Sequence, residues 1–181
     1  MINKTLIAGG LALAFACVGP AMAQDDEIDP KTVDLAKLIA CETYDVPSYN
    51  TVAFWLAGTE GADARRHFGL TEVKSPNFML KQYRLARPIE VFGRTTSLIA
   101  FNSSGPLAVL DEADPHPLAK QLKIEPAIDV PAKFMGERVI SEKTESADGL
   151  TTQTRITLNV STVTTHPGKT LAGCSYKIEV L

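Results

Sequence analysis

Residues 150–164, LTTQTRITLNVSTVT, alternate in a way that decides the fold. The even-numbered positions include Ile156, Leu158 and Val160, whereas the odd-numbered positions from 151 to 161 are polar. A period of two is that of a β-strand, whose successive side chains point to opposite faces of a sheet. One apolar and one polar face are typical of an antiparallel sheet that is covered on one side.

The last residues of the chain, 170–181 (TLAGCSYKIEVL), repeat this alternation. The turn residues His166, Pro167 and Gly168 separate the two stretches. Pairing the stretches as antiparallel neighbours places one apolar set on the covered face: Ala172, Cys174, Tyr176, Ile178 and Val180. Further strands are expected at 78–85, 89–92, 97–102, 107–110 and 139–145, with a turn at Asp148-Gly149 before the stretch at 150–164.

Apolar residues recur at the spacing of a helix earlier in the chain. We expect helices from Asp29-Pro30 to Cys41, from 46 to 57 ahead of Gly58, from Gly61 to Phe68 ahead of Gly69, and from Asp114-Pro115 to Leu122. The predicted fold class is therefore α+β. An antiparallel sheet of about six to eight strands has the N-terminal helices and one mid-chain helix on one face.

The expected order of elements also suggests an internal duplication. A unit of one helix and about three strands would span residues 61–110 and again 114–181. Phe78-Met79 and Phe134-Met135 each begin the strands of one unit. Chance matching of two residues is the alternative.

The N-terminus has the features of an export signal. Residues 1–23 contain Lys4, an apolar run too short to span a bilayer, and small residues at Ala21 and Ala23. We expect cleavage between Ala23 and Gln24, and a periplasmic or secreted protein. Residues 24–29 form a short acidic lead, expected to be flexible, and residues 30–181 form a single globular domain. An uncleaved membrane anchor is the alternative.

Cleavage removes Cys17 and leaves Cys41 and Cys174, an even number in an oxidising compartment. Cys174 is expected on the covered face of the last strand, and Cys41 ends the first helix. We therefore predict a disulfide between them. Closing so long a loop would stabilise the fold by roughly 5 kcal/mol at most. Two separate thiols are the alternative.

Charge and hydropathy exclude some partners. The net charge is −3, and no second long apolar segment follows the signal. Nucleic acid is therefore not expected as a partner, and the mature chain is expected to contain no integral membrane segment.

Two weak candidate sites remain. Trp55, Arg65, Arg66 and His67 could form a binding patch, because Trp and Arg are favoured at interfaces. A core Trp beside a solvated helix end is the plainer interpretation. Asp111, Glu112, Asp114 and His116 form an acidic cluster that could bind a divalent ion if the fold brought these side chains together. An acidic loop and helix N-cap, favoured by the helix dipole, is the plainer interpretation.

No catalytic, cofactor-binding or metal-binding motif is present, and we predict no catalytic residue, cofactor or metal ligand. The sequence favours a non-enzymatic exported binding protein, of inhibitor or immunity type, that acts on an unknown protein or envelope component. One alternative is a small exported hydrolase that uses the Asp111–His116 loop. Another is an envelope structural or assembly factor recruited through an exposed strand edge.

Overall fold

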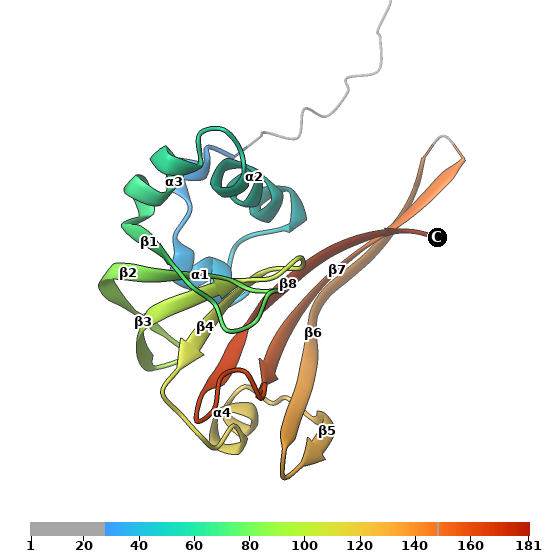
Figure 1. Cartoon of the computed structure of the whole chain (residues 1–181). Helices are drawn as coiled ribbons and strands as arrows, with labels where there is room; N and C mark the ends of the chain where they lie inside the picture. The colour runs from blue at the N-terminus through green and yellow to red at the C-terminus, as the bar shows by residue number, and fades with distance from the viewer. Residues whose placement is uncertain (1–27, 148) are drawn as a thin grey trace, which may run out of the picture.

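A computed structural model describes residues 28–147 and 149–181. In this part of the chain a 3₁₀ turn, Pro30–Thr32, precedes four helices and eight strands (Figure 1). The helices are α1 (Leu35–Ile39), α2 (Val46–Ala57), α3 (Gly61–Phe68) and α4 (His116–Gln121). The strands are β1 (Leu70–Val73), β2 (Lys81–Val91), β3 (Arg94–Phe101), β4 (Pro106–Leu110), β5 (Pro126–Val130), β6 (Lys133–Ala147), β7 (Leu150–Ser161) and β8 (Thr170–Val180).

The eight strands form one antiparallel sheet in the order β1-β2-β3-β4-β8-β7-β6-β5. This confirms the α+β class and the antiparallel sheet. The two edge strands, β1 and β5, were not expected from the sequence. β1 has only four residues. β5 begins at Pro126, and an edge strand tolerates proline because one side of its backbone is unpaired.

The alternation at 150–164 places its apolar side chains in the core, as predicted. Leu158 pairs with Cys174 and Val160 with Ala172 across β7 and β8. All four side chains are buried in the main core. The hairpin between β6 and β7 is also present, with Gly149 at φ 79°.

The single helix predicted from Asp29-Pro30 to Cys41 is replaced by two shorter segments, because two aspartates divide it. Asp29 caps the 3₁₀ turn, Val33 is extended, and Asp34 then caps α1 through bonds from the backbone of Ala36 and Lys37. Each Asp satisfies free N–H groups at its own helix start, so two short helical segments replace one long helix.

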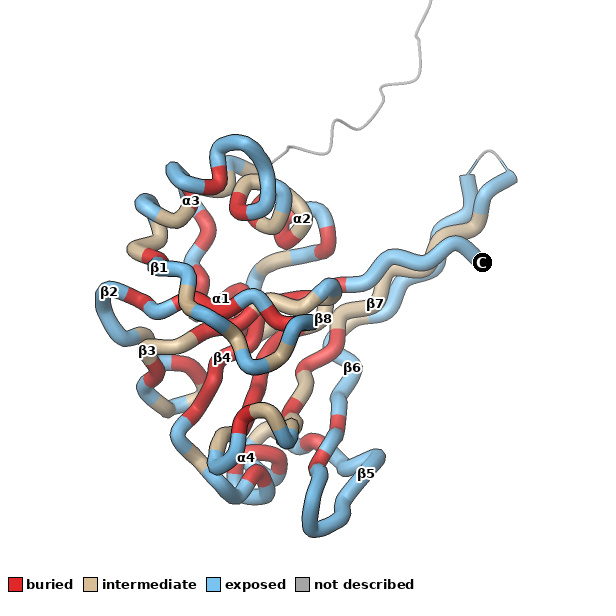
Figure 2. Tube along the Cα trace, viewed as in Figure 1, coloured by how far each residue is buried: buried red, intermediate tan, exposed pale blue. Residues whose placement is uncertain are grey.

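The main core lies between the sheet and the helices. Leu38 of α1, Val52 of α2 and Leu118 of α4 belong to it, together with Ile99 and Leu158 of the sheet. A smaller cluster covers the opposite face at the centre of the sheet: Leu80, Ala100, Leu107, Val109 and Leu171. The middle strands are therefore covered on both faces, and many of their residues are buried (Figure 2).

The predicted disulfide is present. Cys41 and Cys174 are bonded, with their Cα atoms 5.1 Å apart. Tyr176, two residues further along β8, donates a hydrogen bond of 2.8 Å to the Leu38 carbonyl. Together these contacts hold α1 and the turn after it against β8.

Three strands extend beyond the helical part of the molecule. Residues 141–147 of β6, 150–156 of β7 and 176–180 of β8 form a projection that we call the arm (Figure 1). Most of the arm is exposed (Figure 2). The exposed apolar residues on it include Ile178 and Val180.

The element order reads as one helix and four strands, twice: α3 with β1–β4, then α4 with β5–β8. Strands β4 and β8 join the two sets. Each set contains one strand more than the sequence suggested, and the duplication itself stays a prediction.

The signal expected at residues 1–23 and the start of the acidic lead lie outside the described residues. None of the helices within 28–147 and 149–181 is long and apolar enough to cross a membrane.

Candidate functional site

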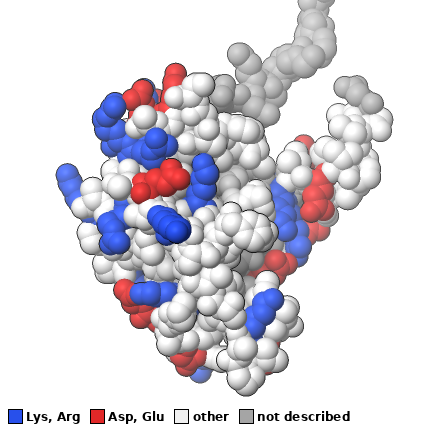
Figure 3. All heavy atoms as spheres, in the orientation of Figure 1, with Lys and Arg blue, Asp and Glu red and all other residues white. Residues whose placement is uncertain are grey.

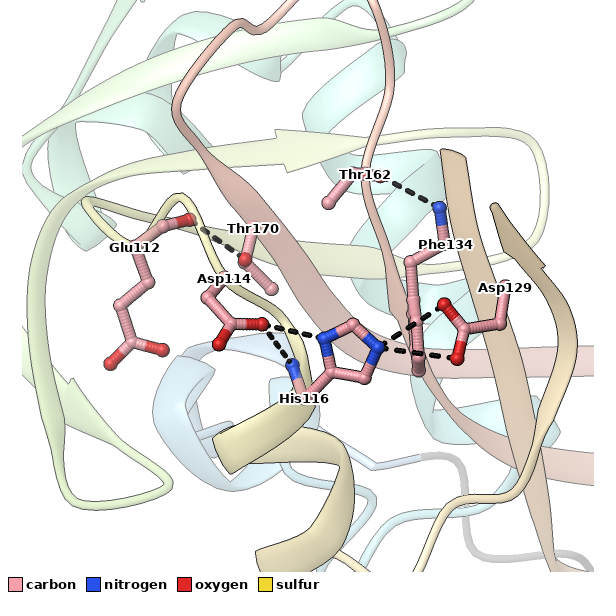
Figure 4. A network of polar contacts seen from close by, with 7 residues as sticks. All are labelled: Glu112, Asp114, His116, Asp129, Phe134, Thr162 and Thr170. Atoms are coloured by element: carbon pink, nitrogen blue, oxygen red, sulfur yellow. Dashed lines mark hydrogen bonds and ion pairs between the residues drawn. The ribbon is translucent and has the colours of Figure 1, made fainter. Parts of the chain in front are cut away.

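His116 lies between two carboxylates at the start of α4 (Figure 4). Its Nδ1 is 2.6 Å from Asp114 Oδ1, and its Nε2 is 3.1 and 3.2 Å from the two carboxylate oxygens of Asp129. The ring also contacts Phe134 edge-on, with the centroids 5.1 Å apart. Asp129 belongs to strand β5, which no pattern in the sequence indicated, and it was therefore not among the predicted site residues.

These two carboxylates favour the charged imidazolium. Hydrogen bonds to Asp114 and Asp129 raise the pKa of His116, and the hydrogen bonds from His116 lower the pKa of Asp114. A general base needs a free ring nitrogen that faces the proton to be taken. Both nitrogens of His116 face carboxylates, and no described hydroxyl is bonded to the ring. The arrangement fastens α4 to the β5–β6 hairpin.

The rest of the predicted acidic cluster is dispersed. Glu112 accepts a bond of 2.9 Å from Arg94, and Asp111 pairs with Lys169. The structure therefore brings together only Asp114 and His116 of the four residues, and adds Asp129.

A cavity of about 820 Å³ opens beside His116. Its lining comes from the start of α4, the β5–β6 hairpin and the segment between β7 and β8. Lys133 and Lys169 line it together with Asp114 and Asp129. Charges of both signs are thus spread around its wall, and no single ligand charge is favoured.

The same cavity reaches the buried His166. Gln82 contacts Nε2 of this ring, and the Thr165 hydroxyl lies 3.1 Å from Nδ1. Burial lowers the pKa of His166. The neutral ring is therefore favoured, and its contacts join the segment between β7 and β8 to β2.

The predicted patch at α2 and α3 is partly assembled. The Trp55 and His67 rings lie 5.5 Å apart, and His67 Nε2 is 3.0 Å from the Lys31 carbonyl. Arg66 forms an ion pair of 2.6 Å with Asp63. Trp55 is half-buried against the main core, so much of the patch is occupied by contacts within the chain.

A different surface on α2 is more open. A groove of about 370 Å³ lies between α2, the segment before β2 and the tip of the β3–β4 hairpin. Phe54, Phe78 and Met79 line it and are 75 %, 98 % and 67 % exposed. Tyr49 and Phe101 are also part of its lining. We call this feature the apolar groove.

The surroundings of these side chains differ from those that the sequence pattern predicts. The sequence predicts a strand that begins at Phe78 and a helix over residues 46–57 that contains Phe54. In the structure β2 begins only at Lys81, and Asn77 holds a turn by accepting a bond of 3.0 Å from the Met79 backbone N–H. The dipeptide Pro76-Asn77 is a turn signal that could have indicated this.

Among the residues that line the groove, one is basic, and further basic side chains lie over neighbouring elements. Lys and Arg gather over α3, β1 and β2, with a few acidic atoms among them (Figure 3). Lys81 lines the groove, and Arg84 and Arg87 are exposed further along β2.

Within the described residues, no group of three or more His, Cys, Asp or Glu side chains could hold a metal ion. Comparison of the chain with protein-family models, with curated proteins and with solved structures finds no match.

Proposed function

We propose that this chain is an exported, non-enzymatic binding protein that recognises a protein partner through the apolar groove. The observation behind the proposal is the exposure of Phe54, Phe78 and Met79 around one concave surface. Contiguous exposed apolar side chains are typical of interaction sites, whereas single ones are normal.

The composition of the groove supports a protein partner. Aromatic residues and Met are enriched in the centres of protein interfaces, and charged groups in their rims. Phe54, Phe78 and Met79 form such a centre, and Lys81 lies at its border. Inhibitor or immunity-type binding is one form that this function would take.

Photo-crosslinking in the exporting cell tests the proposal. The full chain would carry a photoreactive phenylalanine analogue at Phe54, at Phe78 or, as a control, at Val130. Val130 is a 53 % exposed apolar residue of β5, away from the groove. We expect discrete protein adducts from Phe54 and Phe78 and none from Val130.

The partner identified in this way is then purified and its Kd measured. Phe54→Ser and Phe78→Ser should each weaken binding about tenfold or more, because truncated interface anchors have effects of this size. The same adducts from all three positions, or an unchanged Kd in both variants, would contradict the proposal.

A further inference from the structure

The open edge of β8 lies next to the apolar groove. β8 pairs with β4 only from Thr170 to Gly173, whereas it pairs with β7 as far as Val180. Tyr176 donates its backbone N–H to the Ser104 carbonyl at 2.7 Å. Beyond Tyr176, no strand of the described residues lies along this side of β8.

The backbone groups of this edge point outward. Leu181 donates its N–H to the Thr151 carbonyl of β7 at 2.9 Å, while the Tyr176 N–H points the other way. Backbone groups alternate in direction along a strand. The N–H and C=O groups of Ile178 and Val180 therefore face the open edge. Only another extended chain matches such a row of donors and acceptors.

A stacking contact links this edge to the apolar groove. Ile178 and Val180 are 57 % and 68 % exposed and share a face with Tyr176. The Tyr176 ring stacks on Tyr49, with the centroids 5.1 Å apart, and Tyr49 lines the groove. A strand lying along residues 177–181 could therefore extend into the groove past the β3–β4 hairpin.

The outer edge of β6 has a different character. β5 covers only its first residues, up to Gly136. The following residues include Glu137, Arg138, Glu142, Lys143 and Glu145. Arg155 pairs with Glu137 at 3.0 Å and with Glu142 at 3.4 Å. Charged side chains discourage strand pairing. On the β8 edge they are confined to Lys177 and Glu179 on one face, and Ile178 and Val180 leave the other face apolar.

A second copy of the chain is a poor occupant of this edge. A two-fold axis at Ile178 would place Val180 of the copy opposite Tyr176, whose N–H already bonds Ser104. An axis at Glu179 would place two glutamates directly opposite each other, which is unfavourable. Neither restriction applies to a strand from a different polypeptide.

We propose that an extended segment of a partner protein adds to β8 as a further strand along residues 177–181. Its alternate apolar side chains continue over Ile178 and Val180 into the apolar groove. This inference rests on the proposed function, since it specifies how the protein partner is held.

The test uses the exported protein and peptides of about ten residues selected from a displayed random library. This length allows a strand of about five or six residues and an extension toward the groove. The best binder is synthesised and serves as the probe. We expect alternating apolar residues in its sequence. Bound to the unmodified protein, it should slow hydrogen exchange at the Ile178 and Val180 amides.

Ile178→Pro removes an outward N–H without breaking a bond to β7, so the fold should persist. It should weaken peptide binding about tenfold, because the complex loses one backbone hydrogen bond and the close contact between the two strands. Thr144→Pro is the matched control, because its N–H points outward from β6 by the same alternation, and it should leave the Kd unchanged.

Several results would overturn the inference: no binder in the library, no protection of the two amides, or equal effects of both proline variants. Dimerisation that Ile178→Pro abolishes would assign the edge to a second copy and also overturn it. If groove crosslinks persist and Ile178→Pro leaves the partner's Kd unchanged, the proposed function stands and strand addition is wrong.

Discussion

His116 and His166 show how local surroundings set opposite properties for the same side chain. His116 lies between Asp114 and Asp129 on the surface, and hydrogen bonds to these carboxylates raise its pKa. His166 is buried against Gln82, and burial lowers its pKa. The first ring favours its charged form and the second its neutral form.

Titration by NMR should therefore separate the two rings. We expect the pKa of His116 above the ordinary value of about 6.5 and that of His166 below it. Asp129→Asn should lower the pKa of His116 and leave that of His166 unchanged. Equal values for the two rings would show that the contacts of His116 do not persist in solution.

The two shifts have opposite consequences for stability. A raised pKa means that the contribution of His116 is complete below about pH 6.5 and is lost as the pH rises through the folded-state value. A lowered pKa means that His166 destabilises the fold as the pH falls from about 6.5 through its folded-state value. Urea unfolding of His116→Ala and His166→Gln across pH 5–8 measures the two effects.

Phe54 and Phe78 differ from buried apolar residues in what they contribute to stability. Because both are largely exposed, Phe54→Ser and Phe78→Ser should change the free energy of unfolding by no more than about 0.5 kcal/mol. Leu38→Ala, at a fully buried position of α1, should cost about 2–5 kcal/mol. Urea unfolding compares them. A large loss in the Phe variants would mean that these rings pack within the chain in solution.

At the scale of elements, capping aspartates position the helices. Asp45 accepts bonds from the Ser48 backbone N–H at 2.9 Å and from the Ser48 hydroxyl. Burial alone would raise the pKa of Asp45, but these hydrogen bonds outweigh it, and the pKa is lowered. α2 therefore begins at a defined residue, and its outer face presents Phe54 to the groove.

Loss of this cap should be measurable. Asp45→Ala should lower the free energy of unfolding by about 1 kcal/mol, because free N–H groups at the helix start lose their acceptor. Asp45→Asn retains a capping oxygen and serves as the control, with a smaller loss. Equal losses in both variants would assign the effect to charge instead of capping.

At the scale of the whole molecule, the disulfide joins residues from the two ends of the described chain. Cys41 and Cys174 are 133 positions apart, and their bond ties the turn after α1 to β8. β8 is the strand that joins the two halves of the sheet, through β4 on one side and β7 on the other. The bond therefore fastens α1 and the turn after it to the central junction.

The double variant Cys41→Ala/Cys174→Ala should lose about 2–5 kcal/mol of unfolding free energy, because the unfolded chain regains the entropy of a long loop. Urea unfolding of the variant and of the protein with and without reductant measures the loss. Mass analysis of the native protein should detect no free thiol at Cys41 or Cys174. Identical unfolding with and without reductant would contradict a stabilising role.

The sequence alone determined the features that depend on neighbours along the chain. Alternation at 150–164 and 170–181 predicted the paired strands β7 and β8, because side-chain direction in a strand follows position. Gly58 and Gly69, which directly follow the predicted helices, likewise indicated where α2 and α3 end. The disulfide followed from counting cysteines and placing them on facing elements.

Only the tertiary structure decided the features that depend on residues distant in sequence. Asp129 reaches His116 because β5 pairs with β6 beside α4, and no local pattern encodes that pairing. The apolar groove joins α2, the turn before β2 and the β3–β4 hairpin, three segments whose side chains become neighbours only on folding. Periodicity reports which face of an element is apolar. Which of those faces stays uncovered depends on how the sheet and helices pack, and that packing left Phe54, Phe78 and the β8 edge exposed.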